Sequence, residues 1–218
     1  RRPPLVPPDP PGRRVRREGL RQPRPAGRPA RNSLLDINVF GRRAGIAAAE
    51  YAQKADFVEL PEDPESLVVE QIERLRSSTG TERVATIRRE LQECMDANVM
   101  VFRTEQTIKT AVEKIAELRA RYKNVSIQDK GRRFNTDLLE AVELGNLLDL
   151  AEVMAVSALA RKESRGGHYR EDFPNRDDVN FMRHTMAYRE VGDDGAESIR
   201  LDYKPVVQTR YQPMERKY

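Results

Sequence analysis

Residues 136–161 read TDLLEAVELGNLLDLAEVMAVSALAR, in which apolar side chains recur at helical spacing and extend most of the way around the expected helix. A helix that is apolar on nearly every side is usually buried among other elements. We therefore expect 136–161 to be the central, largely buried helix of the fold. Its apolar positions are Leu138, Leu139, Val142, Leu144, Leu147, Leu148, Leu150, Val153, Met154 and Val156.

Three amphipathic patterns precede this stretch, with short joints between them. They cover residues 63–76, 81–98 and 104–123, and in the first of them Asp63 is expected to cap a helix that has Pro64 in its first position. Apolar side chains recur on one side of each pattern at three- and four-residue spacing. Together with the central helix they predict a mainly α fold, an antiparallel bundle of three to four helices.

After the central helix the apolar period changes to that of a strand. The segments FMRHTMAYRE (181–190) and ESIRLDY (197–203) flank a Gly-Asp-Asp-Gly turn at 192–195, a pattern typical of an antiparallel hairpin. VVQTRY (206–211) could add a third strand. We therefore expect the bundle to be followed by a small C-terminal β-hairpin or three-stranded sheet.

The stretch between these two parts, ARKESRGGHYREDFPNRDD (160–178), is the densest functional candidate in the chain. One interpretation is a metal site, but arginines are interleaved throughout and no recognised ligand spacing appears. We favour an ion-pair network that ties the loop to another domain; a solvated surface loop remains open as well. The potential metal ligands are His168, Glu171, Asp172, Asp177, Asp178 and His184.

A further helix is expected at 32–51, NSLLDINVFGRRAGIAAAEY, far from the central helix in sequence. Asn32 and Ser33 are both good N-caps. Gly41 and Gly45 lie on its apolar stripe, where each glycine costs about 1 kcal/mol relative to alanine. This cost indicates that something large approaches the stripe closely, either a neighbouring sheet or helix or a cofactor at the helix start.

Residues 1–31 differ in composition from the rest. They hold ten arginines against only Asp9 and Glu18, together with nine of the 14 prolines, so the basic charge of the chain belongs to this arm. No aromatic residue is present there to stack on bases, so we expect a disordered extension and no nucleic-acid partner. No apolar run reaches the roughly 18 residues that a membrane span needs, which favours a soluble protein. The single cysteine, Cys94, is expected to be a buried thiol.

Several separated motifs resemble one family. NSLLDINVFGRRAG, LQECMDANVMVFR, FNTDLLEAVELGNLLDLAEVMAVSAL and above all RKESRGGHYREDFPNRDDVNFMRHT are similar to the C-terminal part of the succinate dehydrogenase and fumarate reductase flavoprotein subunits. L-aspartate oxidases belong to the same group. The resemblance runs from Asn32 to the C-terminus, with the motifs in the family's order.

This resemblance implies a division of the chain. Residues 32–55 would be the last helix of a flavin-binding domain, 56–162 a helical domain, and 163–218 a loop and β-hairpin subdomain. Ser33 and Leu34 would be the positions that contact FAD, whereas no catalytic residue and no metal ligand is assigned in this chain. The implied enzyme oxidises succinate to fumarate through FAD and passes electrons to an iron-sulfur subunit. Through that subunit it meets membrane anchor subunits, as a peripheral protein on the cytoplasmic face of the bacterial plasma membrane or the matrix side of the mitochondrial inner membrane.

Parts of the family pattern do not occur in this sequence. They are the GxGxxG flavin fingerprint, the histidine joined to FAD and the capping domain with its proton-shuttling arginine. In PAGRPAR (25–31), Arg28 stands at the spacing of the family's substrate-binding arginine, but its neighbours differ and the role is not carried over. The chain alone is therefore expected to be inactive. One hypothesis for residues 1–31 is an out-of-frame or misannotated start, and the alternative is a genuine truncated gene product with a disordered basic arm. The functional alternatives are an L-aspartate oxidase-like fragment and a non-catalytic helical interaction module.

Overall fold

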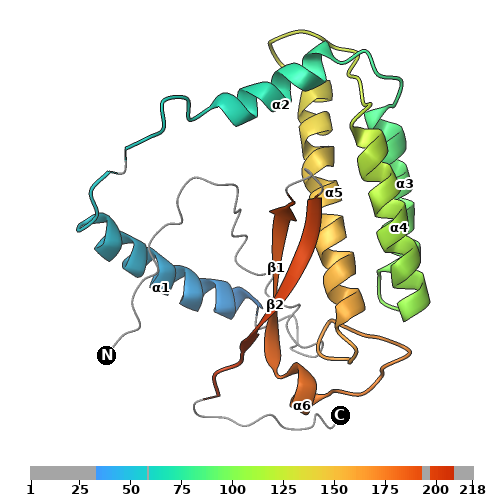
Figure 1. The fold of residues 1–218 in the computed structure, drawn as a ribbon. Coiled ribbons are helices and arrows are strands. Elements are labelled where there is room, and N and C mark those ends of the chain that lie inside the picture. Colours follow the sequence, from blue (N-terminus) through green and yellow to red (C-terminus); the bar gives the residue numbers. More distant parts are fainter. Residues whose placement is uncertain (1–32, 58, 193–196, 209–218) are drawn as a thin grey trace.

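The computed structural model describes residues 33–57, 59–192 and 197–208. The elements in chain order are α1 (Ser33–Ala52), α2 (Ser66–Ser77), α3 (Val84–Asn98), α4 (Glu105–Tyr122), α5 (Thr136–Ala160), α6 (Asp178–Phe181), β1 (Arg183–Val191) and β2 (Glu197–Pro205). Figure 1 shows α3, α4 and α5 side by side, the sheet of β1 and β2 beside them, and α1 apart from the bundle. The predicted class, mainly α with a small C-terminal hairpin, is confirmed.

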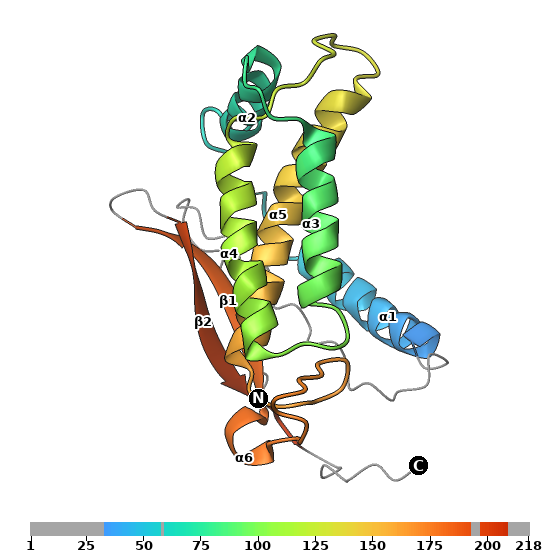
Figure 2. The ribbon, with the colours of Figure 1, turned by 90° about the vertical axis from the view of Figure 1, so that its right-hand side faces the viewer.

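Helices α3, α4 and α5 form the antiparallel bundle, as the two views in Figures 1 and 2 show. Their facing sides carry buried apolar residues at three- and four-residue spacing, which is the spacing that places side chains on one helix face. Each fully buried Ile or Leu contributes about 1.5–3 kcal/mol relative to exposure. Cys94 is a buried free thiol in this core, as predicted. The core residues of the three helices are Val84, Ile87, Leu91, Cys94, Ile108, Ala111, Ile115, Leu118, Ala141, Leu144, Leu148, Ala151, Ala155 and Ala158.

Two helix starts lie later than predicted. Helix α2 begins at Ser66 because residues 63–65 form a turn, in which Ser66 N–H donates to the Asp63 carbonyl, and no side chain caps the helix. Helix α3 begins at Val84 because Glu82 is in a parallel bridge with Val125. The predicted bounds of α4 and α5 agree to within one residue, and Thr104 caps α4 in a reciprocal arrangement with Thr107.

The expectation that α5 is buried on nearly all sides is wrong for this chain. One face packs in the bundle, but Leu139, Leu147, Leu150 and Met154 on the remainder are exposed. Among the described residues, α2, α3, α4 and the hairpin all contact α5, yet they leave these four side chains exposed. An exposed apolar patch on a helix usually marks the place where another domain or protein packs.

Strands β1 and β2 pair antiparallel, with Arg183 opposite Pro205 and Val191 opposite Glu197. The sheet lies against α5. The possible third strand at 206–211 is not formed by residues 206–208, which have no regular structure, and the rest of that segment lies outside the described residues. No described helix is long and apolar enough to cross a membrane.

Candidate functional site

The arginine-rich loop, residues 161–178, follows α5 and leads through α6 into β1 at one end of the bundle (Figures 1 and 2). It is turned back on itself where Arg165 and His168 exchange two backbone hydrogen bonds. Gly166, inside this turn, has a φ of 71°. Glycine adopts this left-handed conformation without steric cost, so the Gly-Gly pair allows the loop to fold tightly.

A buried carboxylate, Glu163, organises the first half of the loop. Its side chain is fully buried and accepts from Arg161 Nε at 2.8 Å, Arg165 Nε at 2.9 Å and the Asp177 backbone N–H at 2.9 Å. A buried charge is tolerated only when it is paired and fully hydrogen-bonded, and here both conditions are met. Arg165 also forms an ion pair with Asp178, whose Oδ1 lies 2.6 Å from Arg165 Nη2, so the charge of this second arginine is neutralised as well.

Arg170 organises the second half. Its guanidinium group is fully buried, donates to the Ala158 carbonyl in the last turn of α5 at 3.1 Å, and pairs through two bonds with Asp172. Asp172 in turn accepts from the Glu105 backbone N–H at the start of α4. The Arg170 hydrogen bonds, together with that of the Glu105 amide, lower the pKa of Asp172 to about 2. A cation therefore lies at the C-terminus of α5 and an anion at the N-terminus of α4, the placement that both helix dipoles favour.

His168 is buried between two arginines and is neutral near pH 7. Its Nδ1 lies 2.7 Å from Arg103 Nη2 and its Nε2 lies 2.9 Å from the Arg161 carbonyl. Because guanidinium groups only donate, Nδ1 accepts and Nε2 carries the proton. Burial, reinforced by the neighbouring arginines, lowers the pKa of His168 to about 4. His168 is thus a fixed structural acceptor and donor, not a proton carrier at neutral pH.

The loop is also tied to the hairpin. Arg161 donates to the Phe181 carbonyl at 2.6 Å and to the Arg183 carbonyl and Thr185 Oγ1, both at 3.2 Å. The ion-pair network is therefore present, whereas its expected role of tying the loop to another domain stays a prediction. The elements that it joins here, the bundle and the hairpin, both belong to this chain.

The residues considered as metal ligands are used differently. Asp172 pairs with Arg170, Asp177 caps α6 by accepting from the backbone N–H groups of Val179 and Asn180, and His184 is exposed on β1. In the described part of the chain, no three His, Cys, Asp or Glu side chains converge so that they could hold a metal ion. The carboxylates of the loop accept from arginines and backbone amides instead.

Helix α1 contains the two residues that the family resemblance assigns to FAD. Ser33 is its first residue, and Leu34, which is 68% exposed, is its second. Every residue of α1 whose exposure is described is exposed, and a Cβ added at Gly41 or Gly45 would meet nothing within 4 Å. The close approach expected at these glycines is not made by any described part of this chain. Asn32, the other expected cap, and Arg28 lie outside the described residues.

Sequence analysis did not identify Arg103 as part of this site. Arg103 lies in the α3–α4 joint, where it donates to the carbonyls of Val99 and Tyr169 as well as to His168. No local pattern indicates this role, because its partners in the loop are 65 and 66 residues away in sequence.

The bundle, the loop and the hairpin together form a helical module with a small two-stranded sheet. Residues 88–218 match the family model described as "Fumarate reductase flavoprotein C-term", and the chain belongs to this family.

Relatives and solved structures agree with this assignment. The chain is 44% identical over 186 residues to the succinate dehydrogenase flavoprotein subunit of Rickettsia bellii, covering 84% of this chain and 30% of that protein. A solved quinol-fumarate reductase with menaquinol molecules matches with a TM-score of 0.73 and 41% identity, over 81% of this chain and 30% of the other. The Mycobacterium smegmatis Sdh1 complex in the apo form matches with a TM-score of 0.71 and 34% identity, over 82% and 30%. This chain thus spans about 30% of the length of the relatives that it matches.

Proposed function

We propose that this chain is the C-terminal region of an FAD-dependent flavoprotein subunit that interconverts succinate and fumarate. The observation that carries the proposal is its 44% identity to a succinate dehydrogenase flavoprotein subunit over 84% of the chain, with a matching fold in solved relatives. The named relatives are flavoprotein subunits, which supports FAD as the cofactor. This chain spans about 30% of their length, so it contributes to the activity only what its own residues can do.

The start of α1 is the proposed contact with one edge of FAD. The first amides of any helix lack intrahelical partners and carry a partial positive charge, so those of Ser33 and Leu34 can bind negative charge on the pyrimidine edge of a flavin ring. The exposed Leu34 side chain offers an apolar surface at the same place. When bound, FAD would supply the hydride acceptor for succinate oxidation. The contribution of this chain is to position that edge of the ring and to stabilise charge on it.

The exposed apolar surfaces support the division into domains. Leu34, Leu35 and Ile37 on α1 and Leu139 and Met154 on α5 are all exposed, although each of them is large and apolar. Surfaces of this kind normally pack against another body. In the proposed subunit, residues 32–55 complete a flavin-binding domain, and 56–162 and 163–218 form the helical domain and the loop and hairpin subdomain packed beside it.

Partners follow from the same family. The solved relatives are named as a quinol-fumarate reductase and an Sdh1 complex. For this chain we infer an iron-sulfur subunit as the electron acceptor and, through it, membrane anchor subunits. The protein would then be peripheral, on the cytoplasmic face of a bacterial plasma membrane or the matrix side of a mitochondrial one.

The competing function within the family resemblance is an L-aspartate oxidase. A succinate-oxidising subunit and an L-aspartate oxidase differ in substrate and in partner, so measurements on one preparation can distinguish them. The protein is isolated from its source through a C-terminal tag, its FAD and co-isolated subunits are measured, and dye reduction is followed with succinate or with L-aspartate. We expect FAD, an iron-sulfur protein and succinate-dependent dye reduction. Oxidation of L-aspartate but not succinate would favour the alternative, and a preparation without flavin or either activity would favour a non-catalytic module.

A further inference from the structure

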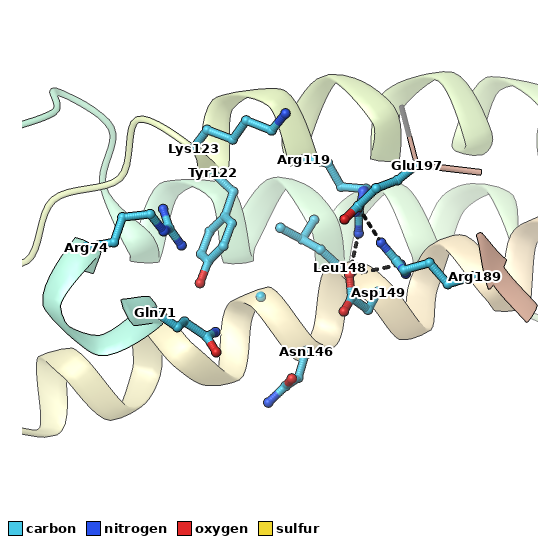
Figure 3. Close-up of a pocket in the computed structure, with 11 residues that line it drawn as sticks. Gln71, Arg74, Arg119, Tyr122, Lys123, Asn146, Leu148, Asp149, Arg189 and Glu197 are labelled. Carbon is cyan, nitrogen blue, oxygen red and sulfur yellow. Dashed lines mark hydrogen bonds and ion pairs between the residues drawn. The ribbon is translucent and has the colours of Figure 1, made fainter. Parts of the chain in front are cut away.

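A cavity of about 560 Å³ opens between α2, α4, α5 and the hairpin. Figure 3 shows Arg74 of α2 directed toward the ring of Tyr122, the last residue of α4, with Gln71 below them and Lys123 directly after the end of α4. The volume lies within the range of about 300–1,000 Å³ that is usual for small-molecule sites. The cavity therefore has room for an organic ligand as well as water.

The end of the cavity next to the hairpin is electrostatically satisfied. Arg119 pairs with Asp149 and Glu197, and Arg189 pairs with the same two carboxylates at 2.9 Å and 2.8 Å (Figure 3). Arginines held by two carboxylates have little remaining attraction for an outside anion. Ligand charge is therefore not recognised at this end.

The opposite end carries uncompensated positive charge. Among the described residues, neither Arg74 nor Lys123 has a carboxylate within ion-pair distance, and both are exposed. The Arg74 guanidinium carbon lies 5.5 Å from the centroid of the Tyr122 ring, which holds it over the ring face. The Tyr122 hydroxyl donates to the Ala141 carbonyl at 2.8 Å, so the ring is fixed to α5.

The wall below Tyr122 is shaped by a glycine. A Cβ at Gly145 would lie 2.7 Å from the Tyr122 hydroxyl oxygen, so only glycine leaves the ring in this position. The result is a flat aromatic wall beside a guanidinium group. Guanidinium groups bind carboxylate and phosphate through two parallel hydrogen bonds, and aromatic faces accept the uncharged part of a ligand.

We propose that this cavity binds a small organic anion, with Arg74 holding its carboxylate or phosphate group, Lys123 adding charge at the rim, and the Tyr122 ring contacting its uncharged part. Such a ligand would join α2 to the bundle. Among the described residues of α2, only Leu75 is buried. This helix is therefore held weakly, and a contact with a bound ligand should stabilise it more than the other walls of the cavity.

The test uses the protein isolated with its bound subunits, in buffer with physiological salt. Calorimetric titrations use citrate, inorganic phosphate and adenosine monophosphate as probes, so that carboxylate and phosphate recognition are separated. Hydrogen exchange of residues 66–77 is measured with and without each probe. We expect at least one probe to bind with a Kd below about 1 mM and to slow exchange in α2.

Variants decide whether the site is the one described. Arg74→Gln should weaken binding at least tenfold and Lys123→Gln by a smaller factor. Arg89→Gln, which removes an exposed positive charge from α3 away from the cavity, should leave the Kd unchanged. Lys123→Gln also serves if Arg74→Gln fails to fold, because the Lys123 side chain is exposed. Absence of binding by all three probes, or equal weakening by Arg89→Gln and the cavity variants, would overturn the proposal.

Discussion

Arg170 and Asp172 form a two-bond ion pair that joins the C-terminal end of α5 to the N-terminal end of α4. Arg170 Nε lies 2.8 Å from Asp172 Oδ1, and Nη2 lies 2.7 Å from Oδ2. The Arg170 side chain is fully buried, and it donates to the Ala158 carbonyl while Asp172 accepts from the Glu105 amide. The pair is therefore a cross-link between two bundle helices built from loop residues.

Replacing Arg170 with alanine should be strongly destabilising. The substitution leaves Asp172 and the last carbonyls of α5 without their partner, and removing one member of a buried pair costs about 3–5 kcal/mol. Urea denaturation followed by circular dichroism measures the loss. As a control, Arg200→Ala breaks an exposed pair with Glu190 on the hairpin and should cause no resolvable change. Equal effects of the two variants would show that Arg170 is not the cross-link described here.

His168 predicts a specific dependence of stability on pH. Its pKa is lowered from 6.5 to about 4 in the folded protein by burial. The unfolded chain therefore binds a proton at this residue in a range where the folded chain does not. Its neutral form stabilises the fold fully above pH 6.5, and that stability is lost as the pH falls toward 4, at up to about 1.4 kcal/mol per pH unit.

The chain offers a matched pair of variants for this test. His168→Gln should remove that part of the pH dependence between about pH 7 and pH 5, at a cost in stability, while His184→Gln, on the exposed hairpin residue, should retain it. Unfolding midpoints in urea across this range give the slopes. An identical slope in wild type and His168→Gln would contradict the buried neutral histidine.

Gly80 makes a close contact that no other residue can make. A Cβ there would lie 2.0 Å from the Asn124 carbonyl oxygen, which is backbone and cannot move aside cheaply. Gly80→Ala should therefore lower the free energy of unfolding by about 2 kcal/mol or more, measured by thermal or urea denaturation. Gly41→Ala is the control, because its Cβ would meet nothing within 4 Å in this chain and alanine favours the helix.

The proposed flavin contact at α1 can be probed by charge. Leu34→Glu places a negative side chain beside the amides assigned to the flavin edge, so FAD should bind about tenfold more weakly, and the flavin should become harder to reduce. Leu35→Glu puts the same charge in the same helical turn and helps the helix equally, but Leu35 is not assigned to the flavin. FAD content and the flavin midpoint potential of the isolated complex are the readouts. Equal behaviour of the two variants would argue against Leu34 as a contact.

How much could be predicted from sequence depends on the range of the interactions. Helices α3, α4 and α5 were predictable because their apolar spacing is a local signal. The later start of α3 was not, because it results from a bridge between Glu82 and Val125. The same holds for the open face of α5, since a sequence pattern shows that a face is apolar but not what covers it.

The candidate site, too, has features that local sequence predicts and features that depend on long-range contacts. The mixture of arginines and carboxylates in the loop predicted an ion-pair network, and the network is present. Which carboxylate serves which arginine, and the part played by Arg103, depend on distances across the fold. The cavity beside Arg74 left no sequence signal, because its lining comes from three helices and a hairpin. The assignment of Ser33 and Leu34 rests on family resemblance and stays a prediction.

The most direct test of the proposed function is an anaerobic titration of the isolated, FAD-containing complex with succinate, with mass spectrometry to verify that residues 33–218 are present in its flavoprotein subunit. The account predicts that succinate bleaches the flavin absorbance and that fumarate restores it. A flavin that succinate leaves oxidised, or a complex with this chain that contains no flavin, would contradict the assignment of this region to a succinate-oxidising enzyme.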